Sequence, residues 1–326
     1  MSITYSFIIP VKEINDYVRE SVPNILKIKR NDFEIIIYPD RKNEESWLHA
    51  RQIATGPGGP AMKRSLAIKD ARGKILIFID DDAYPDKNFL DVLDKDFQYK
   101  SIVAVGGPAL TPRDDSFLQK VSGSVFLSSL SGGFPERYVP TGKPRFVEDW
   151  PSVNLSVRKE DFKDTGGFDS EYWPGEDTKF CLDLIRVSKK KILYDPRLIV
   201  YHHRREGLRR HLNQVGNYGL HRGYFAKRFP GTSLRLKYFI PSALLIFIIA
   251  GSILSLLYPA IFKFYLLGLS FYVLALIKAF RDIRKYEKNL FIALHSLYYI
   301  FFTHLSYGYK FLQGLLFTRH LKSKLR

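Results

Sequence analysis

Three adjacent aspartates, Asp80, Asp81 and Asp82, directly follow an apolar run at residues 74–79 that predicts a buried strand. Adjacent carboxylates repel one another unless a cation or hydrogen-bond donors are close. Because alternate side chains of an extended segment point the same way, Asp80 and Asp82 can converge while Asp81 points elsewhere. Oxygen ligands of this kind suit Mg²⁺ or Mn²⁺ held between carboxylates and phosphates. The position after a buried strand favours a metal–diphosphate site over the alternative, a solvated acidic turn.

A glycine- and proline-rich loop at residues 56–60 precedes this strand and leads into Lys63 and Arg64. The loop lacks the Gly-x-x-x-x-Gly-Lys-Ser/Thr pattern of a Walker loop. Its flexible backbone and the two cations could contact a nucleotide or a diphosphate, but loops of this composition are commonly plain connections. The loop alone therefore leaves both interpretations open.

Strands and helices alternate along the first 236 residues. Apolar, β-branched runs predict the strands, and helical periodicity with start and stop signals predicts the helices between them. The predicted strands are 6–9, 33–38, 74–79 and 102–105, and the predicted helices are 16–27 and 60–72. This order implies an α/β fold with a mostly parallel sheet that is covered by helices on both faces. In such sheets ligands bind outside the carboxyl ends of the strands, where the three aspartates lie.

Several short motifs follow one another along the chain and together carry a family resemblance. They are Ile8-Ile9-Pro10-Val11, Gly59 to Ser65, Phe78 to Pro85, Asn154 to Arg158, Gly166 to Asp169 and Gly175-Glu176-Asp177. In this order they resemble the signatures of family 2 nucleotide-sugar glycosyltransferases of the GT-A fold, a Rossmann-like α/β fold, over roughly residues 3–228. The tail from Thr303 to Tyr309 is similar to membrane-bound members that build polysaccharides or lipid-linked glycans.

The resemblance assigns the first acidic cluster to the sugar donor. Asp80 would hold the nucleotide and help to bind the metal, and Asp82 would be the principal metal ligand. Some family members use a histidine beyond the strand predicted here at 198–200, which implies His202 as a further ligand, with His203 as the alternative. The expected cofactor is Mg²⁺ or Mn²⁺, whereas a solvated basic turn is the other interpretation of the two histidines. The remaining residues implied in nucleotide-sugar binding are Pro10, Asp40, Lys63 and Arg64.

The resemblance also assigns the later acidic pair, Glu176 and Asp177, to catalysis. An acceptor hydroxyl is a poor nucleophile, and a carboxylate within hydrogen-bond reach can take its proton during attack on the anomeric carbon. Asp177 is the expected general base and Glu176 its orienting neighbour, although acidic residues are also common at helix N-termini because of the helix dipole. One displacement with one base inverts the anomeric centre. The residues expected to bind the acceptor are Trp173 and Asn154.

Charge and hydropathy are unevenly distributed along the chain. From Lys237 onward, 12 Lys and Arg residues stand against 2 acidic residues, and the longest apolar runs lie in the same segment. This pattern is unlike a uniformly basic nucleic-acid module, so no nucleic-acid partner is expected. The uncharged run 238–258 is long enough to cross a bilayer, and a second run at 261–279 completes a hairpin within 237–288; two buried core helices are the alternative. The basic flanks of the hairpin favour a cytoplasmic location for the first domain.

The last segment, 289–326, has two interpretations. Its apolar run is rich in aromatic residues but holds His295, His304 and Lys310. We expect a helix that lies in the cytoplasmic interface against the catalytic domain, and a third membrane span is the alternative. The predicted domains are therefore a GT-A domain at 1–236, a membrane hairpin at 237–288 and an interfacial or third membrane helix at 289–326.

These expectations combine into a membrane-anchored, inverting, metal-dependent glycosyltransferase. It would move a sugar from a nucleotide-diphosphate sugar to an acceptor hydroxyl at the cytoplasmic membrane face, on a lipid-linked or polysaccharide precursor, in contact with membrane lipids. Two alternatives use related chemistry: a polyprenyl-phosphate sugar transferase, and a nucleotidyltransferase with a GT-A-like sheet. A third alternative, a non-catalytic membrane scaffold, is disfavoured by the intact Asp80, Asp82 and Asp177. The sequence leaves the sugar, the nucleotide base, the acceptor and the oligomeric state open.

Overall fold

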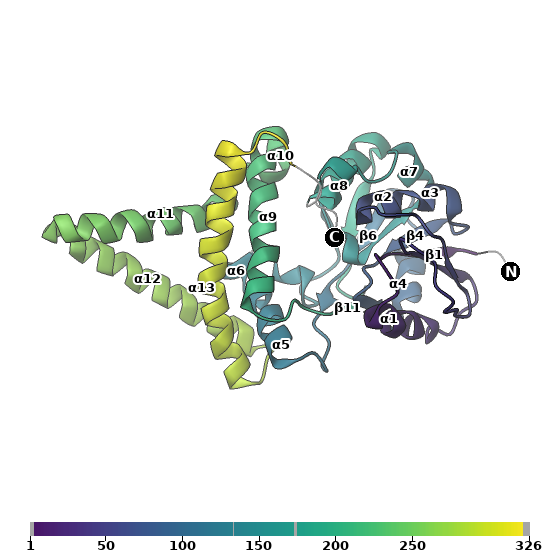
Figure 1. Ribbon diagram of the computed structural model, residues 1–326, viewed down its shortest axis with the longest axis horizontal. Coiled ribbons are helices and arrows are strands. Elements are labelled where there is room, and N and C mark those ends of the chain that lie inside the picture. The colour runs from purple at the N-terminus through teal and green to yellow at the C-terminus, as the bar shows by residue number, and fades with distance from the viewer. Residues whose placement is uncertain (1–2, 133, 173–174, 322–326) are drawn as a thin grey trace. The chain divides into compact units, whose positions relative to one another are not determined.

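The computed structural model describes residues 3–132, 134–172 and 175–321. Contacts divide the chain into two compact units, which are the sheet-containing part and the all-helical part in Figure 1. The first unit comprises the residues up to Pro112 and Val139–His203, and the second comprises Arg113–Tyr138 and Arg204–Leu321. The predicted boundary divides the chain once, at residue 236, whereas each unit defined by contacts is made of separate segments of the chain. The predicted boundary therefore stays a prediction.

A mixed sheet forms the centre of the first unit. Within the described residues its eight strands are, in spatial order, β3 (Ala50–Gln52), β2 (Phe33–Tyr38), β1 (Tyr5–Pro10), β4 (Ile75–Phe78), β9 (Leu155–Arg158), β6 (Ile102–Gly106), β10 (Lys191–Tyr194) and β8 (Arg145–Val147). Strands β8 and β9 run opposite to the others, so the sheet is largely parallel, as predicted. Strand β9 was not predicted, and it enters between β4 and β6.

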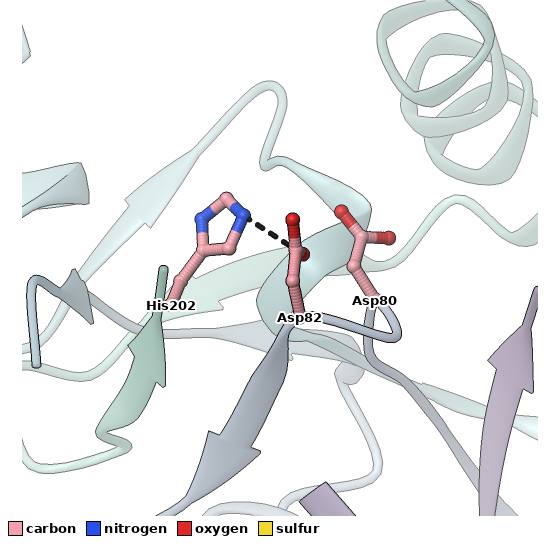
Figure 2. Close-up of side chains that lie close together, drawn as sticks. All are labelled: Asp80, Asp82 and His202. Carbon is pink, nitrogen blue, oxygen red and sulfur yellow. Dashed lines mark ion pairs between the residues drawn. The ribbon is translucent and has the colours of Figure 1, made fainter. Parts of the chain in front are cut away.

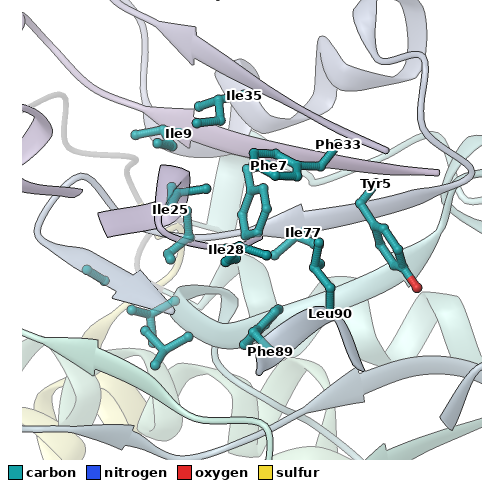
Figure 3. Packing of buried hydrophobic residues seen from close by; sticks show 14 of the residues in the cluster. Tyr5, Phe7, Ile9, Ile25, Ile28, Phe33, Ile35, Ile77, Phe89 and Leu90 are labelled. Carbon is teal, nitrogen blue, oxygen red and sulfur yellow. The ribbon is translucent and has the colours of Figure 1, made fainter. Parts of the chain in front are cut away.

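Helices cover both faces of this sheet. They are α1 (Asp16–Leu26) and α4 (Phe89–Asp96) on one face, and α2 (Pro60–Ser65), α3 (Ala67–Asp70), α7 (Lys159–Asp164) and α8 (Glu176–Ser188) on the other. Every residue of β1 and β2 is buried, as their largely apolar runs predict, and the two polar residues among them, Ser6 and Glu34, are hydrogen-bonded to each other at 2.8 Å. Figure 3 shows Ile25 of α1 and Phe89 of α4 packed near Phe7 and Ile77 of the sheet. The predicted α/β class is therefore confirmed.

One predicted helix near the site is broken into two in the structure. The helix predicted at 60–72 is two short helices, α2 and α3, separated at Leu66. The Ser65 hydroxyl lies 3.0 Å from the carbonyl oxygen of Ala61, one turn earlier, and it accepts a hydrogen bond of 2.9 Å from the N–H of Phe168. A serine that bonds back to the preceding turn and outward to another segment perturbs helical hydrogen bonding, which accounts for the break.

A second, smaller sheet lies beyond the carboxyl end of β4. Its strands, in spatial order, are β5 (Ala83–Pro85), β11 (Val200–His202) and β7 (Ala109–Leu110). The strand predicted at 198–200 instead begins at Val200, because Leu198 and Ile199 belong to the turn that follows β10. His202 is consequently the last residue of a strand, directly opposite Ala83 of β5.

The second unit is helical. Its helices are α5 (Phe117–Ser124), α6 (Ser129–Gly132), α9 (Leu208–Arg228), α10 (Pro230–Ser233), α11 (Leu236–Leu257), α12 (Pro259–Arg284) and α13 (Leu290–Leu312), with a π-helical turn at Gln313–Phe317. Helices α9 and α13 lie side by side and run in the same direction (Figure 1). Glycines allow this close approach: a Cβ at Gly219 would lie 2.5 Å from the carbonyl oxygen of Tyr307, and one at Gly223 would lie 2.0 Å from that of Phe311.

A buried histidine connects three helices of this unit. His211 of α9 lies 2.8 Å from the hydroxyl of Ser122 in α5 and 2.8 Å from that of Thr303 in α13, one contact for each ring nitrogen. Burial lowers the pKa of His211 to about 4, so the imidazole is neutral at physiological pH. A neutral imidazole can donate to one hydroxyl and accept from the other.

Three described helices are long and apolar enough to cross a membrane, α11, α12 with its extension to Tyr286, and α13 with its extension to Phe317, with mean hydropathies of 2.4, 2.0 and 1.2. Their most apolar windows are buried to 6%, 0% and 39%, respectively. Helices α11 and α12 extend together from one side of α13 (Figure 1). The first two helices therefore expose their apolar surfaces as a hairpin, whereas α13 packs along the unit.

Candidate active site

The loop after β4 brings two carboxylates and one imidazole together in the first unit. The potential ligand atoms of Asp80, Asp82 and His202 all lie within 4.8 Å of one another. Asp82 Oδ1 and His202 Nε2 are 3.2 Å apart (Figure 2). Asp82 and His202 are buried, whereas Asp80 is partly exposed. The predicted convergence of the two aspartates is thus present in the structure.

The neighbouring residues point away from this cluster. Asp81 accepts a hydrogen bond of 2.8 Å from the side-chain amide of Asn15, the residue that also caps α1. His203 lies 3.1 Å from Glu20 and 5.0 Å, ring to ring, from Tyr17, both on α1. Because alternate residues of an extended chain face opposite sides, the geometry favours His202 over His203 as a metal ligand.

Arg64 connects the first acidic cluster to the second. Its guanidinium nitrogens lie 2.6 Å from Oδ1 of Asp80 and 3.2 Å from Oε1 of Glu176. The side chain of Arg64 is only 4% exposed and that of Glu176 only 8%, so this ion pair is shielded from water. The sequence predicts Arg64 near the donor but does not indicate this link to Glu176, because the link depends on how α2 and α8 pack on the sheet.

The second acidic pair begins α8. Gly175 precedes it with a φ of 114°, in the left-handed region that glycine adopts without strain, and its N–H donates to Oε2 of Glu176 at 3.1 Å. Burial, with a contribution from the Asp177 carboxylate, raises the pKa of Glu176 to about 7, against the opposing effect of Arg64. Asp177 is more accessible and accepts a hydrogen bond of 2.7 Å from the N–H of Thr178.

The carboxyl ends of β1 and β2 are joined by a buried lysine. The Lys63 ammonium pairs with the carboxylate of Asp40 and donates to the carbonyl oxygen of Val11 at 2.5 Å. Pro10 is the last residue of β1, directly before this contact. Pro10, Asp40 and Lys63 therefore lie at the same sheet edge as Asp80, as the prediction of a donor site requires.

The two predicted acceptor residues have different outcomes. The side-chain amide of Asn154 donates to the carbonyl oxygens of Leu198 at 2.7 Å and Pro108 at 3.2 Å, and the residue is 1% exposed. Asn154 therefore holds two loops together, an arrangement that does not favour the predicted acceptor contact. Trp173 lies outside the residues that the structure describes.

The donor set of Asp80, Asp82 and His202 fits a divalent cation. Carboxylate oxygens are the preferred ligands of Mg²⁺ and Mn²⁺, and imidazole is a better ligand for transition metals than for Mg²⁺. A buried carboxylate such as Asp82 beside a second carboxylate is also costly without positive charge nearby. The residues present are therefore compatible with both metals and fit Mn²⁺ at least as well as Mg²⁺.

Residues 6–148 match the model of the family described as glycosyl transferase family 2. A pre-mycofactocin glycosyltransferase of Mycobacterium tuberculosis is 27% identical over 172 residues, which cover 53% of this chain and 36% of that protein. The chain thus spans little more than a third of the length of that relative.

Two further comparisons cover more of the chain. A dolichyl N-acetyl-alpha-D-glucosaminyl phosphate 3-beta-D-2,3-diacetamido-2,3-dideoxy-beta-D-glucuronosyltransferase of Methanococcus voltae is 25% identical over 255 residues, 76% of this chain and 73% of that protein. The structure of mannosyltransferase PcManGT from Pyrobaculum calidifontis covers 96% of this chain and 87% of its own, with a TM-score of 0.56 and 15% identity. This likeness confirms the GT-A fold.

Proposed function

We propose that this chain is a membrane-anchored, metal-dependent, inverting glycosyltransferase. It moves a sugar from a nucleotide-diphosphate sugar to a hydroxyl group of a lipid-linked or polysaccharide precursor at the cytoplasmic membrane face. Asp80, Asp82 and His202 hold Mg²⁺ or Mn²⁺, Asp177 is the general base and Glu176 orients it. Pro10, Asp40, Lys63 and Arg64 surround the donor.

The observation that carries this proposal is the Arg64 bridge. A metal–diphosphate cluster and a catalytic base must lie on either side of one anomeric carbon, so the two acidic groups have to be near each other. One guanidinium contacts Asp80 and Glu176 at 2.6 and 3.2 Å, which places both carboxylates within the span of a single side chain. If the two groups lay on opposite surfaces, the reaction would be excluded.

Each group then has a defined task. Asp177 accepts the proton of the attacking hydroxyl, because its carboxylate is more accessible than that of Glu176 and lies at the start of α8. Glu176, fixed by Arg64 and by the N–H of Gly175, restricts the position of Asp177. A bound divalent cation supplies positive charge that offsets the charge of the departing diphosphate. A single displacement of this kind inverts the anomeric configuration.

Two features support a nucleotide-sugar donor. The Nε atom of Arg64 is buried and has no hydrogen-bond partner within the described part of the chain, which leaves a donor for a ligand at the sheet edge. Lys63 fixes the loop around Asp40, next to which a nucleotide would bind. The similar structure of the Pyrobaculum mannosyltransferase is a complex with GDP-Man and Mn²⁺. This complex agrees with a nucleotide-sugar donor and with Mn²⁺ as the ion held by Asp80, Asp82 and His202.

The acceptor is proposed from the membrane helices and one relative. Helices α11 and α12 expose apolar surface along their lengths, as helices in contact with lipid do. The Methanococcus protein is named for transfer to a dolichyl N-acetylglucosaminyl phosphate, an acceptor on which a sugar is joined to a lipid through phosphate. An acceptor of this class brings a sugar hydroxyl to an enzyme that is anchored in the bilayer.

Helix α13 is proposed to lie in the membrane interface and not to cross the bilayer. It packs along α9, a helix of 21 residues and thus about 31 Å long. Helix α9 exposes Arg209, Arg210, Lys227 and Arg228 near its two ends. If α13 crossed the membrane, α9 would lie across it as well. The charges at its ends could reach the two bilayer surfaces, but the exposed Asn213 and the half-buried Gln214 and Asn217 between them would lie in hydrocarbon, where polar side chains are costly.

The activity is tested by offering the purified chain a panel of nucleotide sugars with Mn²⁺ or Mg²⁺ and measuring nucleoside-diphosphate release. We expect release with one donor, inverted configuration of the product by NMR, and loss of both in Asp82→Asn and Asp177→Asn. Asp164→Asn, an exposed acid on α7, is the matched control and keeps activity. Normal turnover in either site variant removes the role given to that residue.

The product distinguishes the alternatives. Pyrophosphate release indicates a nucleotidyltransferase, and an acid-labile sugar phosphodiester indicates transfer to a polyprenyl phosphate itself.

Membrane topology is tested with single cysteines and a membrane-impermeant maleimide on intact cells. The native Cys181 is fully buried, which limits background labelling. We expect Lys263→Cys, near the start of α12 and so close to the tip of the hairpin, to react from outside, and Lys285→Cys and Thr318→Cys to react only after the cells are opened. Reaction of Thr318→Cys from outside would show that α13 crosses the bilayer.

A further inference from the structure

Asn15 connects the start of α1 to the turn that carries the two aspartates proposed to bind the metal. Its amide oxygen accepts a hydrogen bond of 3.0 Å from the N–H of Val18 and so caps the helix. Its amide nitrogen donates to Oδ2 of Asp81 at 2.8 Å, 66 positions further along the chain. Each end of this amide therefore has its own partner, and rotating the amide by half a turn would place its oxygen against the Asp81 carboxylate.

The residue type at this position is informative. Serine and aspartate cap helices about as well as asparagine does. An ionised aspartate, however, has no proton to donate to Asp81, and the hydroxyl of a serine reaches one bond less far than the amide of Asn15. Capping alone therefore does not require asparagine here, whereas the contact with Asp81 does.

Two further hydrogen bonds hold the backbone of the same turn. The N–H of Ala83 donates to the carbonyl oxygen of Asp80 at 3.2 Å and closes the turn. The carbonyl oxygen of Ala83 accepts from the buried hydroxyl of Ser21, also on α1, at 2.6 Å. Helix α1 thus contacts this turn twice, and the Asn15 contact is the one that sets the direction of an aspartate side chain.

Three consecutive carboxylates make this direction important. Asp81 and Asp82 are only 9% and 4% exposed, and the side chains of Asp80 and Asp82 lie close together on the turn (Figure 2). Negative charges this close repel one another, so a turn in which Asp81 is not held would relax by moving its carboxylates apart. Metal ligands must stay within about 0.5 Å of their productive positions, which such a movement would exceed.

We propose that Asn15 is a positioning residue of the metal site. By holding the Asp81 carboxylate against α1, it keeps Asp80 and Asp82 directed toward the ion. Asn15 acts through Asp81 and is not itself a ligand. The inference rests on the proposed function in one respect, that Asp80 and Asp82 hold the divalent cation.

The test is Mn²⁺ binding by the full chain in nanodiscs without donor, measured from the electron paramagnetic resonance signal of the free ion. Asn15→Asp keeps the cap but sets a second carboxylate against Asp81, and we expect it to lower the Mn²⁺ affinity about 10- to 100-fold, as loss of outer-shell partners does. Adding Asp81→Asn exchanges donor and acceptor at unchanged net charge and should restore most of the affinity. Asn24→Asp places the same new charge on the same helix, where Asn24 bonds only within α1 to Glu20 and Lys27, and it is the matched control that leaves the affinity unchanged.

Melting temperatures of all variants are compared, so that binding is measured on folded chains. A purely capping role predicts unchanged Mn²⁺ affinity in Asn15→Asp, because aspartate caps equally well. That result, or an exchanged pair that does not restore the affinity, overturns the proposal. Asp82→Asn in the same assay separates it from the proposed function: undiminished Mn²⁺ binding in Asp82→Asn contradicts the metal assignment itself, whereas loss in Asp82→Asn with full binding in Asn15→Asp contradicts only the positioning role.

Discussion

Replacing Arg64 by lysine tests the link between the two acidic groups most directly. Arginine reaches Asp80 and Glu176 at once because its guanidinium is a rigid fork, whereas a lysine ammonium is a point charge that can pair closely with only one of them. One charge-assisted hydrogen bond in a shielded site is worth about 1.5–3 kcal/mol. If that contribution supports the transition state, Arg64→Lys lowers kcat/KM by about 10- to 150-fold.

The assay is steady-state release of nucleoside diphosphate, combined with a double-mutant cycle. Glu176→Gln is measured alone and together with Arg64→Lys, and the two losses should be strongly non-additive because both variants break the same contact. Arg72→Lys, at an exposed position after α3, is the matched control. Additive losses, or an Arg64→Lys variant with unchanged kcat/KM and an unchanged melting temperature, would refute the reasoning.

Three further predictions concern the metal, the pH dependence of stability and helix packing. His202→Ala should weaken Mn²⁺ binding, measured by calorimetry, at least about tenfold, whereas His203→Ala should not; equal Mn²⁺ affinities in the two variants contradict the ligand assignment. The folded chain holds His211 at a pKa of about 4, below its ordinary value of 6.5, so the unfolded chain binds more protons between these values. Stability in detergent should therefore be full above pH 6.5 and fall as the pH is lowered toward 4, and His211→Gln should flatten this dependence. Gly223→Ala should destabilise the chain by roughly 1–3 kcal/mol because its Cβ would meet a backbone carbonyl, whereas Gly231→Ala, with open space around it, should be neutral; equal melting temperatures would argue against the α9–α13 contact.

The sequence predicts the layered α/β fold well because its strongest signals are local. Continuous apolar runs predict β1, β2, β4 and β6 to within two residues, since each strand is buried on both faces and its sequence is almost entirely apolar, with Ser6 and Glu34 as the polar exceptions in β1 and β2. Alternation along an extended chain likewise predicts that Asp80 and Asp82 converge while Asp81 faces away.

Contacts between distant segments could not be predicted in the same way. The bridge from Arg64 to Glu176 joins residues 112 positions apart, and its formation depends on the packing of two helices on one sheet face. The choice between His202 and His203 likewise depends on distant contacts, because His203 is held against Glu20 and Tyr17 of α1, which are far from it in sequence. Asn154 was expected to bind the acceptor because it belongs to a family motif. Its side chain is instead buried in hydrogen bonds to Pro108 and Leu198, and the sequence around Asn154 does not indicate these contacts.

The order in which the chain enters the two compact units limits how the protein can be shortened. It leaves the sheet-containing unit after Pro112, returns at Val139 and leaves again after His203. A truncated chain ending at residue 236 would therefore keep α5 and α9 but lose α13, and with it the surface against which Gly219 and Gly223 are packed. Soluble fragments cut at the first apolar helix should thus expose a glycine-lined helix face and aggregate, so biochemical work on this enzyme is best done with all its helices in detergent or lipid.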